Sequence, residues 1–563
     1  MNALFLVGTA AIAFVFGYRF FAKLLALGVL RLGANYSTET AAASGHTEVH
    51  GTGRHLLLIH HAIILTSGAT VIGSVIALTW GWIPALLWIV IGTTVGGGML
   101  NMGSLWLATR YPRPSLLEFG AALGGRLLGV TVVSVAALML VLLAALCTVI
   151  TAKLLVMQPQ VVPTLIIVVM LSWLLGRVLR HRVGLDILPI TIIALIVVLA
   201  LMWLTTGYPV SLSGALNFDI AGSSWFSINA LVGWVLALAV FGFVASQLTP
   251  GRFAQPYALL NTLLLAALLI VMLAGLLIAP PRLIAPEFHS PTDGPGYVPW
   301  LFVLLCSGAV AGLAFVAAAT TTAPRLPKPA DARYVGYGSA IIEGVVALAA
   351  LIIAGVAFTD VEVWKQHLGQ WPAILDLGTA VAVFLDGLVR LSGTLEIEAV
   401  FARTLAATIV AGLCLTTLEA SLRMLTALFA DFTGPLALSA PKDQLLRRLT
   451  ASGVVLAIVL GTVAGSGGKL LLAYGATSLG LAALAFAFLS VGLRAHGRSV
   501  FLAAACAVFL VAILLWFVVE RMAAWWHADR WVPFLAGIVL FGVFGAVALA
   551  LARAYRHPPS SPT

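Results

Sequence analysis

Fifteen segments of about 20 mostly apolar residues follow one another along this chain, and they restrict its fold more than any other feature. Such a segment crosses the hydrocarbon core of a bilayer as a helix, because backbone polar groups there must be paired within the protein. The segments are 3–25, 55–79, 84–108, 127–152, 161–179, 186–206, 230–249, 256–279, 298–322, 335–358, 400–429, 447–466, 470–493, 499–520 and 532–552. With 61% hydrophobic and 9% charged residues, the chain is too apolar for a soluble protein. The sequence predicts an all-α polytopic protein of the lipid bilayer with about 15 transmembrane helices.

A sixteenth apolar stretch, 372–392, contains two aspartates and Arg390, which are costly at membrane depth. Lys and Arg collect in the loops that the order of the spans places in the cytoplasm. The Lys and Arg residues in the last third of the chain also lie on the cytoplasmic side only if 372–392 does not cross the membrane. We therefore expect an interfacial or re-entrant segment there, with Met1 outside and Thr563 inside. This loop bias also explains the net charge of +10, so no nucleic-acid partner is expected.

The order of the spans predicts four parts. A peripheral N-terminal span (1–30) comes first, and additional helices (447–563) come last. Between them lie two units of five crossings each, 55–206 and 230–429, which start from opposite sides of the membrane. Inverted repeats of this kind are the architecture of many secondary transporters, which bind substrate at the midplane where helices are broken.

Two neighbouring spans, 55–79 and 84–108, combine small and polar residues. Small residues permit close helix contact, and hydroxyl groups can pair with backbone groups that a helix break sets free. We expect 66–69 to be non-helical and to face a cavity, whereas plain helix packing with interfacial histidines is the alternative. The substrate-binding candidates in these spans are His60, His61, Thr66, Ser67, Gly68 and Asn101.

Two carboxylic acids lie inside apolar spans. Glu343 has no basic residue within four positions, whereas Glu419 precedes Arg423 by one helical turn. A carboxyl group at membrane depth is a candidate for ion or proton coupling. We expect Glu343 to be the proton-responsive group, with His61 as the next candidate. For Glu419 and Arg423, a coupling role and a purely structural ion pair both stay open.

Neither a metal site nor a cofactor is expected. A group of possible metal ligands lies between His46 and His61 and includes Glu48, His50 and His55. These residues show no HExxH or other tight ligand spacing. The stretch GSGGKL (465–470) lacks the first glycine and the final hydroxyl residue of a phosphate-binding loop. The four cysteines lie far apart in apolar segments and predict no disulfide bond.

Six motifs in order resemble the carbon starvation protein A (CstA) family of bacterial inner-membrane transporters, between roughly His55 and Arg494. The family patterns are GHHF, R…SLxE, SGTTP, DAR-x-VGYG…EG, LTTxD…TR and FGAxNQ. The matching residues are His60-His61, Arg110 with SLLE (115–118), TTTAP (320–324), ADARYVGYG (330–338) with Glu343-Gly344, LTTLE (415–419) with Arg423, and YGA (474–476).

The resemblance implies secondary active transport on an inverted-repeat fold of the amino acid–polyamine–organocation type. The expected substrate is pyruvate, taken up with protons, or a peptide. The resemblance also adds Thr321 and Thr322 to the substrate-binding candidates and Arg333 to the coupling candidates. We expect the substrate site between 55–79 and 230–249, with 298–322 alongside. The partners are then a small-molecule substrate and a coupling proton or cation, and an oligomer or a small partner subunit stays open.

The chain also departs from the family pattern. The prolines that follow the histidine pair in the family are absent, Asn101 stands in place of an acid, and Val410 stands in place of another. These changes leave a second interpretation, a diverged membrane subunit or sensor that keeps the fold and moves no substrate. Under neither interpretation do we expect the protein to be an enzyme.

Overall fold

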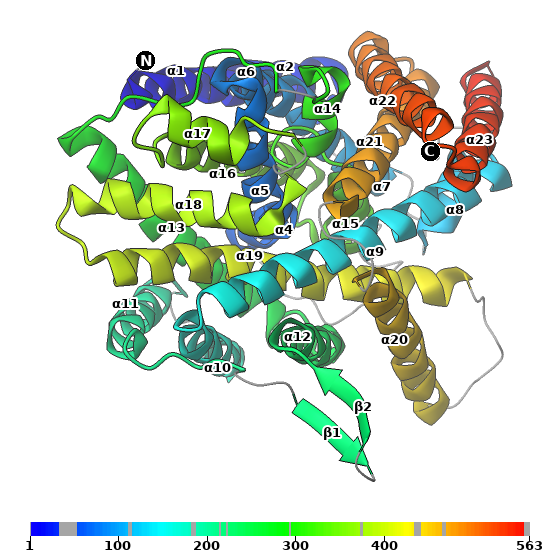
Figure 1. Cartoon of the computed structure of the whole chain (residues 1–563). Coiled ribbons are helices and arrows are strands. Elements are labelled where there is room, and N and C mark those ends of the chain that lie inside the picture. The colour runs from blue at the N-terminus through cyan, green and yellow to red at the C-terminus, as the bar shows by residue number, and fades with distance from the viewer. Residues whose placement is uncertain are drawn as a thin grey trace.

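The structure, a computed structural model, describes residues 2–32, 53–110, 115–181, 187–212, 216–220, 223–291, 294–371, 375–432, 441–463 and 469–556. Helices make up nearly all of this part of the chain (Figure 1). One small antiparallel hairpin, β1 (Leu216–Ile220) and β2 (Ser223–Ile228), extends from the helical bundle. The all-helical membrane fold predicted from the sequence is therefore confirmed, with this hairpin as an addition.

Ten helical segments of the described chain are long and apolar enough to cross a membrane. Seven consist of one helix each: α9 (Arg126–Met157), α10 (Val161–His181), α12 (Ala230–Gln247), α13 (Ala254–Ile278), α19 (Ala399–Phe432), α21 (Lys469–Ala495) and α22 (Phe501–His527). Three contain a π-helical turn: α1 (Ala3–Phe16) with α2 (Ala22–Leu24), α6 (Trp82–Ile91) with α7 (Gly98–Arg110), and η8 (Arg333–Tyr337) with α16 (Gly338–Gly355). Three further apolar helices are α11 (Ile187–Thr205), α20 (Pro441–Val463) and α23 (Trp531–Arg556).

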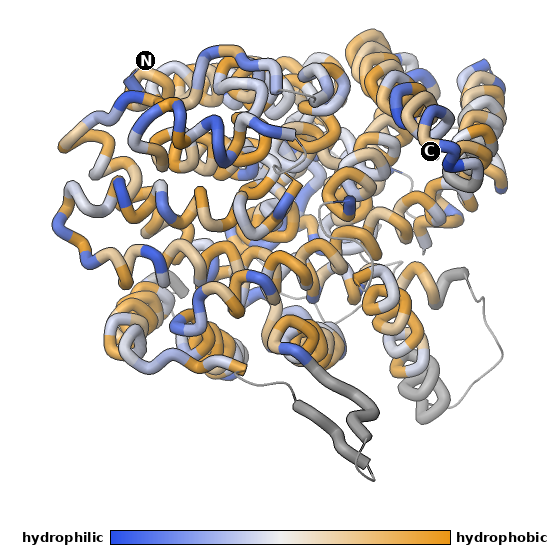
Figure 2. Tube along the Cα trace, in the orientation of Figure 1, coloured by the Kyte–Doolittle hydropathy of each residue, from blue (hydrophilic) through white to orange (hydrophobic). Residues whose placement is uncertain are grey.

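Large apolar side chains cover the outside of the bundle. Phe5 and Ile12 of α1 are 62% and 72% exposed, and Phe501 and Val508 of α22 are 79% and 70% exposed. Hydrophobic residues run along whole helices, while hydrophilic ones gather toward helix ends and connections (Figure 2). Soluble proteins rarely expose apolar surface on this scale, whereas lipid accepts it. The chain is a multi-pass membrane protein.

Two helices of the bundle are broken. The first consists of α4 (Arg54–Leu65) and α5 (Gly68–Ala77), and the chain bends there by 52°. The second consists of α14 (Tyr297–Leu304) and α15 (Leu313–Ala317), which are separated by the non-helical residues 305–312. Since α14 packs on α5 and α15 packs on α4, the two broken helices lie antiparallel.

A long helix pair, α9 and α19, crosses the bundle side by side and supports both broken helices (Figure 1). α12 packs against both members of this pair, and so does α20. α13 packs on α19 and α4, while α21 packs on α9 and on both halves of the second broken helix. α12 and α20 thus each pack against both helices of the long pair.

This packing corrects one expectation. The sequence predicted a substrate site between 55–79 and 230–249 with 298–322 alongside, but α12 packs on α9, α19 and α20, and the helix antiparallel to the first broken helix is α14–α15. The order of the spans misled the prediction because α10 and α11 lie between α9 and α12 in sequence and pack together at the side of α13 and α19.

Three shorter helices complete the bundle: α8 (Leu116–Gly124), α17 (Val361–Leu368) and α18 (Leu377–Gly393). α18 coincides with most of the segment that was predicted to be interfacial, and it packs on α16 and α19. The Asp376 carboxylate caps its N-terminus and accepts a hydrogen bond from Lys153 Nζ at 2.6 Å, while Asp386 pairs with Arg403. Lys153 and Arg403 thus neutralise the two aspartates whose charges argued against a membrane crossing by this segment.

Candidate functional site

The first break is formed by small polar residues. Thr66 and Ser67 are fully buried, and neither has helical backbone angles. Thr66 Oγ1 donates to the Ala62 carbonyl oxygen at 2.9 Å, and Ser67 Oγ accepts from the Ala69 N–H at 3.2 Å. Hydroxyl groups thus pair with backbone groups on both sides of the break, as an N-cap serine does. The sequence predicted a non-helical stretch over 66–69, but Gly68 and Ala69 already belong to α5.

The second break is held by side chains of three other helices. Glu343 Oε1 of α16 accepts from the Gly308 N–H at 2.8 Å, and Thr93 Oγ1 donates to the Gly308 carbonyl at 3.0 Å. Ser478 Oγ of α21 accepts from the Gly312 N–H at 3.0 Å. The backbone groups that the break sets free are therefore paired within the protein, which burial in a membrane requires.

A chain of hydrogen bonds connects the first half-helix, the neighbouring span and the second broken helix. His61 Nε2 of α4 donates to Asn101 Oδ1 at 3.1 Å, and Asn101 Nδ2 donates to the Gly97 carbonyl at 2.9 Å. With the hydrogen on Nε2, His61 Nδ1 accepts from the Thr322 hydroxyl at 2.7 Å. Three residues predicted separately, His61, Asn101 and Thr322, thus form one buried network.

Glu419 and Arg423 form an ion pair within α19, one helical turn apart. Arg423 also donates to the Leu248 carbonyl at 2.7 Å and to the Ala245 carbonyl at 3.2 Å, at the C-terminal end of α12. A cation at this position complements the helix dipole and the last carbonyls. The pair therefore connects α19 to α12.

The structure places the remaining predicted residues differently. His60 is 4% exposed and its Nδ1 has no hydrogen-bond partner among the described residues. Thr321 Oγ1 lies 3.2 Å from the Thr320 hydroxyl. Arg333 lies over the Tyr18 ring and donates to the Tyr18 carbonyl at 2.9 Å, so it fastens the N-terminal span and does not reach either break.

The predicted absence of a metal site is only partly covered by the structure. His46, Glu48 and His50 lie outside the described residues. His55 Nδ1 lies 2.8 Å from the Tyr334 hydroxyl. Within the described ranges, no three His, Cys, Asp or Glu side chains gather as a metal-binding group would.

The surroundings of the breaks are tightly packed. A Cβ atom at Gly68 would lie 2.2 Å from Cys414 Sγ, and one at Gly475 would lie 2.1 Å from the Val303 carbonyl oxygen. An apolar void beside α5 has a volume of about 10 Å³, which is about the space of one water molecule. A side chain larger than that of glycine therefore has no room at position 68 in this conformation.

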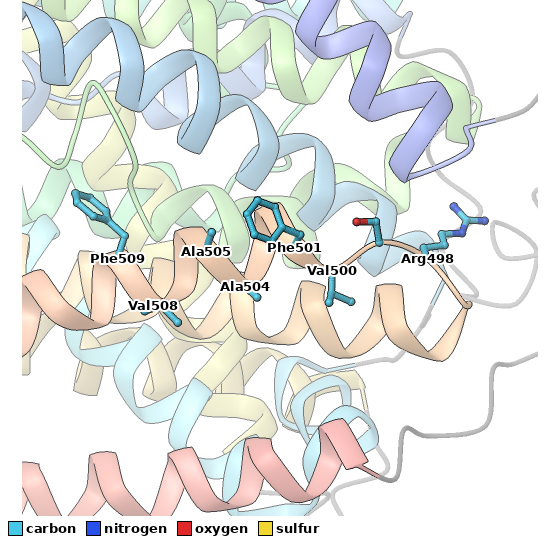
Figure 3. Close-up of a pocket in the computed structure, with 8 residues that line it drawn as sticks. Arg498, Val500, Phe501, Ala504, Ala505, Val508 and Phe509 are labelled. Atoms are coloured by element: carbon cyan, nitrogen blue, oxygen red, sulfur yellow. The ribbon is translucent and has the colours of Figure 1, made fainter.

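A hollow of about 840 Å³ lies on the outside of the bundle at the start of α22 (Figure 3). It is lined by Arg498, Ser499, Val500, Phe501, Ala504, Ala505, Val508 and Phe509. Most of these side chains are apolar, so the hollow belongs to the lipid-facing surface. None of the predicted site residues lines it.

Sequence reasoning missed several polar residues of the second break. Thr93, Ser307, Ser478 and Tyr474 all contact it, and Ser307 Oγ lies 2.7 Å from the Tyr474 hydroxyl. The stretch 305–312 contains Cys-Ser-Gly and a second glycine inside an apolar run. This is the same kind of signal that identified the first break.

Comparison with known proteins identifies the family of this chain. A family model described as "Carbon starvation protein CstA" matches residues 2–370. The chain belongs to the CstA family. The peptide transporter CstA of Helicobacter pylori is 28% identical over 366 residues, which cover 63% of this chain and 51% of that protein.

Two Escherichia coli proteins are similar over a comparable share of this CstA family member. The peptide transporter CstA is 26% identical over 364 residues, which cover 63% of this chain and 50% of that one. The pyruvate/proton symporter BtsT is 24% identical over 368 residues, with 63% and 49% covered. The chain spans about half the length of the curated relatives that it matches. Among solved structures, the manganese transporter of Eremococcus coleocola aligns with a TM-score of 0.45 at 14% identity, covering 91% of this chain and 98% of that one.

Proposed function

We propose that this protein is a secondary active transporter of the bacterial inner membrane that moves a small organic nutrient by alternating access. The substrate is a pyruvate-like carboxylate or a short peptide, in line with the names of its relatives. Transport is coupled to protons or another cation. The observation that carries the proposal is the antiparallel pair of broken helices, α4–α5 and α14–α15. In transporters with inverted repeats, the substrate binds where such helices are broken near the midplane.

The helix packing supports an inverted repeat with boundaries that differ from the sequence expectation. In our proposal, the first repeat contains 54–157 and 230–278, and the second contains 297–495. Each then begins with a broken helix and contains one helix of the α9–α19 pair. α10 and α11 are an insertion in the first repeat. This division keeps fifteen crossings, with α18 as a segment that does not cross.

The substrate site in this proposal lies between the two breaks. Thr66, Ser67 and Gly68 contribute the first break, and His61 reaches the second broken helix through Thr322. In this conformation the first break is packed closely against Cys414 of α19. Substrate then binds as the two halves of the bundle move apart.

Proton coupling is assigned to Glu343. Its carboxylate accepts the Gly308 N–H at the second break, so a change in its protonation acts directly on the unwound backbone. Glu419 is already paired with Arg423 and serves as a structural connection between α19 and α12.

Uptake by purified protein in liposomes tests the proposal. With an acidic outside and a neutral inside, we expect labelled pyruvate or labelled trialanine to accumulate above the external concentration, and a protonophore to abolish this accumulation. The control is a preparation of liposomes without protein, which should accumulate neither substrate. Failure of the wild-type protein to move any small carboxylate or peptide would favour the non-transporting membrane subunit.

A further inference from the structure

A buried basic cluster lies beside the first half-helix, and neither the proposed coupling nor the ion pair of α19 accounts for it. It consists of His60 on α4, Arg325 on the 3₁₀ turn η6 (Ala323–Arg325), and Arg423 on α19. His61, which follows His60, accepts from the Thr322 hydroxyl at 2.7 Å, and Arg325 donates to the carbonyl of the adjacent Thr321 at 2.5 Å. α4 packs against both α19 and the π-helical turn η5 (Ala318–Thr322), which precedes η6. The three groups therefore share one junction between the half-helix, the second broken helix and the long helix pair.

The charges at this junction do not balance. Arg423 is paired with Glu419 and with two carbonyl groups of α12. Arg325 donates to the Thr321 carbonyl at 2.5 Å, and it forms no ion pair with the described side chains. Asp331, the acid that follows on the same segment, pairs instead with Arg54 at 4.0 Å. One partly buried guanidinium charge is thus left without a counter-ion among the described side chains.

His60 adds an unused donor to this charge. Its side chain is 4% exposed, and Nδ1 has no partner within the described chain, although buried ring nitrogens are normally hydrogen-bonded. Its neighbour His61 has both ring nitrogens bonded. In the tautomer with hydrogen on Nδ1, His60 offers one N–H at the junction where the guanidinium group of Arg325 offers a planar pair of donors. Such a set matches the two oxygens of a carboxylate.

We propose that His60 and Arg325 form a carboxylate-recognition site on the α4 side of the first break. The proposal rests on the transport function proposed above and specifies its substrate as an organic carboxylate. This group is the carboxylate of a keto acid or the C-terminal carboxylate of a peptide. The site opens as α4 moves away from α19, and Arg423, held by Glu419, adds positive potential without contacting the substrate.

Equilibrium binding to the purified full-length protein tests this site directly. The probes are labelled pyruvate, labelled trialanine and labelled trialanine C-terminal amide, which lacks the charged group. For Arg325→Gln we expect at least about tenfold weaker binding of pyruvate and trialanine, because a charge-assisted hydrogen bond is lost. Binding of the amide should stay within about twofold of the wild-type value. Arg325→Lys should recover part of the carboxylate affinity, because the charge returns without the planar fork.

The matched control is Arg252→Gln, which removes an exposed positive charge from the turn between α12 and α13. It should bind all three probes like the wild type. His60→Asn is the second site variant and serves in place of Arg325→Gln if that variant does not fold. It should weaken carboxylate binding and leave amide binding unchanged.

The outcomes separate this site from the transport function. The site is overturned if wild-type protein binds neither carboxylate, if Arg325→Gln binds them as well as Arg252→Gln does, or if acid and amide weaken equally. If the wild-type protein binds carboxylates through Arg325 but moves none of them in liposomes, the site stands and the transport function fails. If liposomes accumulate only the amide, transport stands and the carboxylate site is wrong.

Discussion

Replacing Glu343 separates two roles of one carboxyl group, the pairing of the second break and the coupling to protons. Glu343 Oε1 accepts the buried Gly308 N–H at 2.8 Å. In Glu343→Gln an amide oxygen can still accept this hydrogen bond, so we expect a loss of less than about 1 kcal/mol in the free energy of unfolding. In Glu343→Leu the N–H is left buried without an acceptor, and the expected loss is about 1–3 kcal/mol.

Glu343→Gln should therefore keep most of its stability and yet lose proton coupling. Because Gln cannot take up or release a proton, Glu343→Gln should abolish accumulation driven by a pH gradient while leaving substrate exchange across the liposome membrane intact. The free energies of unfolding are measured by denaturant titration in mixed micelles, and accumulation is measured with labelled substrate. The control is Glu362→Gln on α17, whose exposed side chain pairs with Lys365.

Two results would refute this reasoning. If Glu343→Gln still concentrates substrate on a proton gradient, the coupling group lies elsewhere, and His61 is the next residue to test. If Glu343→Leu unfolds no more easily than Glu343→Gln, the contact with Gly308 contributes nothing to stability. The first result concerns coupling and the second concerns the break, so each role stands or falls separately.

Three further predictions follow from close contacts and from charge distribution. Gly68→Leu should block transport, because even a Cβ atom would lie 2.2 Å from Cys414 Sγ. Gly68→Ala should lose activity for the same reason and regain it when Cys414→Gly removes the sulfur atom. Unchanged uptake by Gly68→Leu would contradict this packing. Gly475→Ala should lower the free energy of unfolding by about 1–3 kcal/mol, because its Cβ atom would lie 2.1 Å from the Val303 carbonyl oxygen; an unchanged denaturation midpoint would exclude this contact. A cysteine at position 495 should react with a membrane-impermeant thiol reagent only from the cytoplasmic side, and labelling from outside would overturn the fifteen-span topology.

Hydropathy alone located the helices well. Each of the fifteen predicted spans overlaps a helix or a broken helix of the structure, because about 20 apolar residues in a row have few alternatives in a membrane. Hydropathy could not predict which helices pack against each other. α10 and α11 have the length and apolarity of core helices, so nothing in their composition marks them as lying at the side of the bundle.

The two breaks differ in how visible they are in the sequence. The first was predicted from Thr66, Ser67 and Gly68, three small or polar residues in an apolar span. The second, at 305–312, contains Ser307 and Gly308 but is otherwise apolar, and its polar partners come from distant parts of the chain. Thr93 and Ser478 acquire their roles only when the fold brings them to this backbone.

The structure also explains why the missing prolines do not argue against transport. In the CstA family pattern, prolines follow the histidine pair and break the helix, whereas this chain has Thr66 and Ser67 at the break. A proline breaks a helix by removing a backbone donor, while here the Ser67 side chain competes for the Ala69 N–H and caps the next helix. Either device can end one helix and start another. The broken geometry, on which the proposed mechanism depends, is therefore retained by other chemistry.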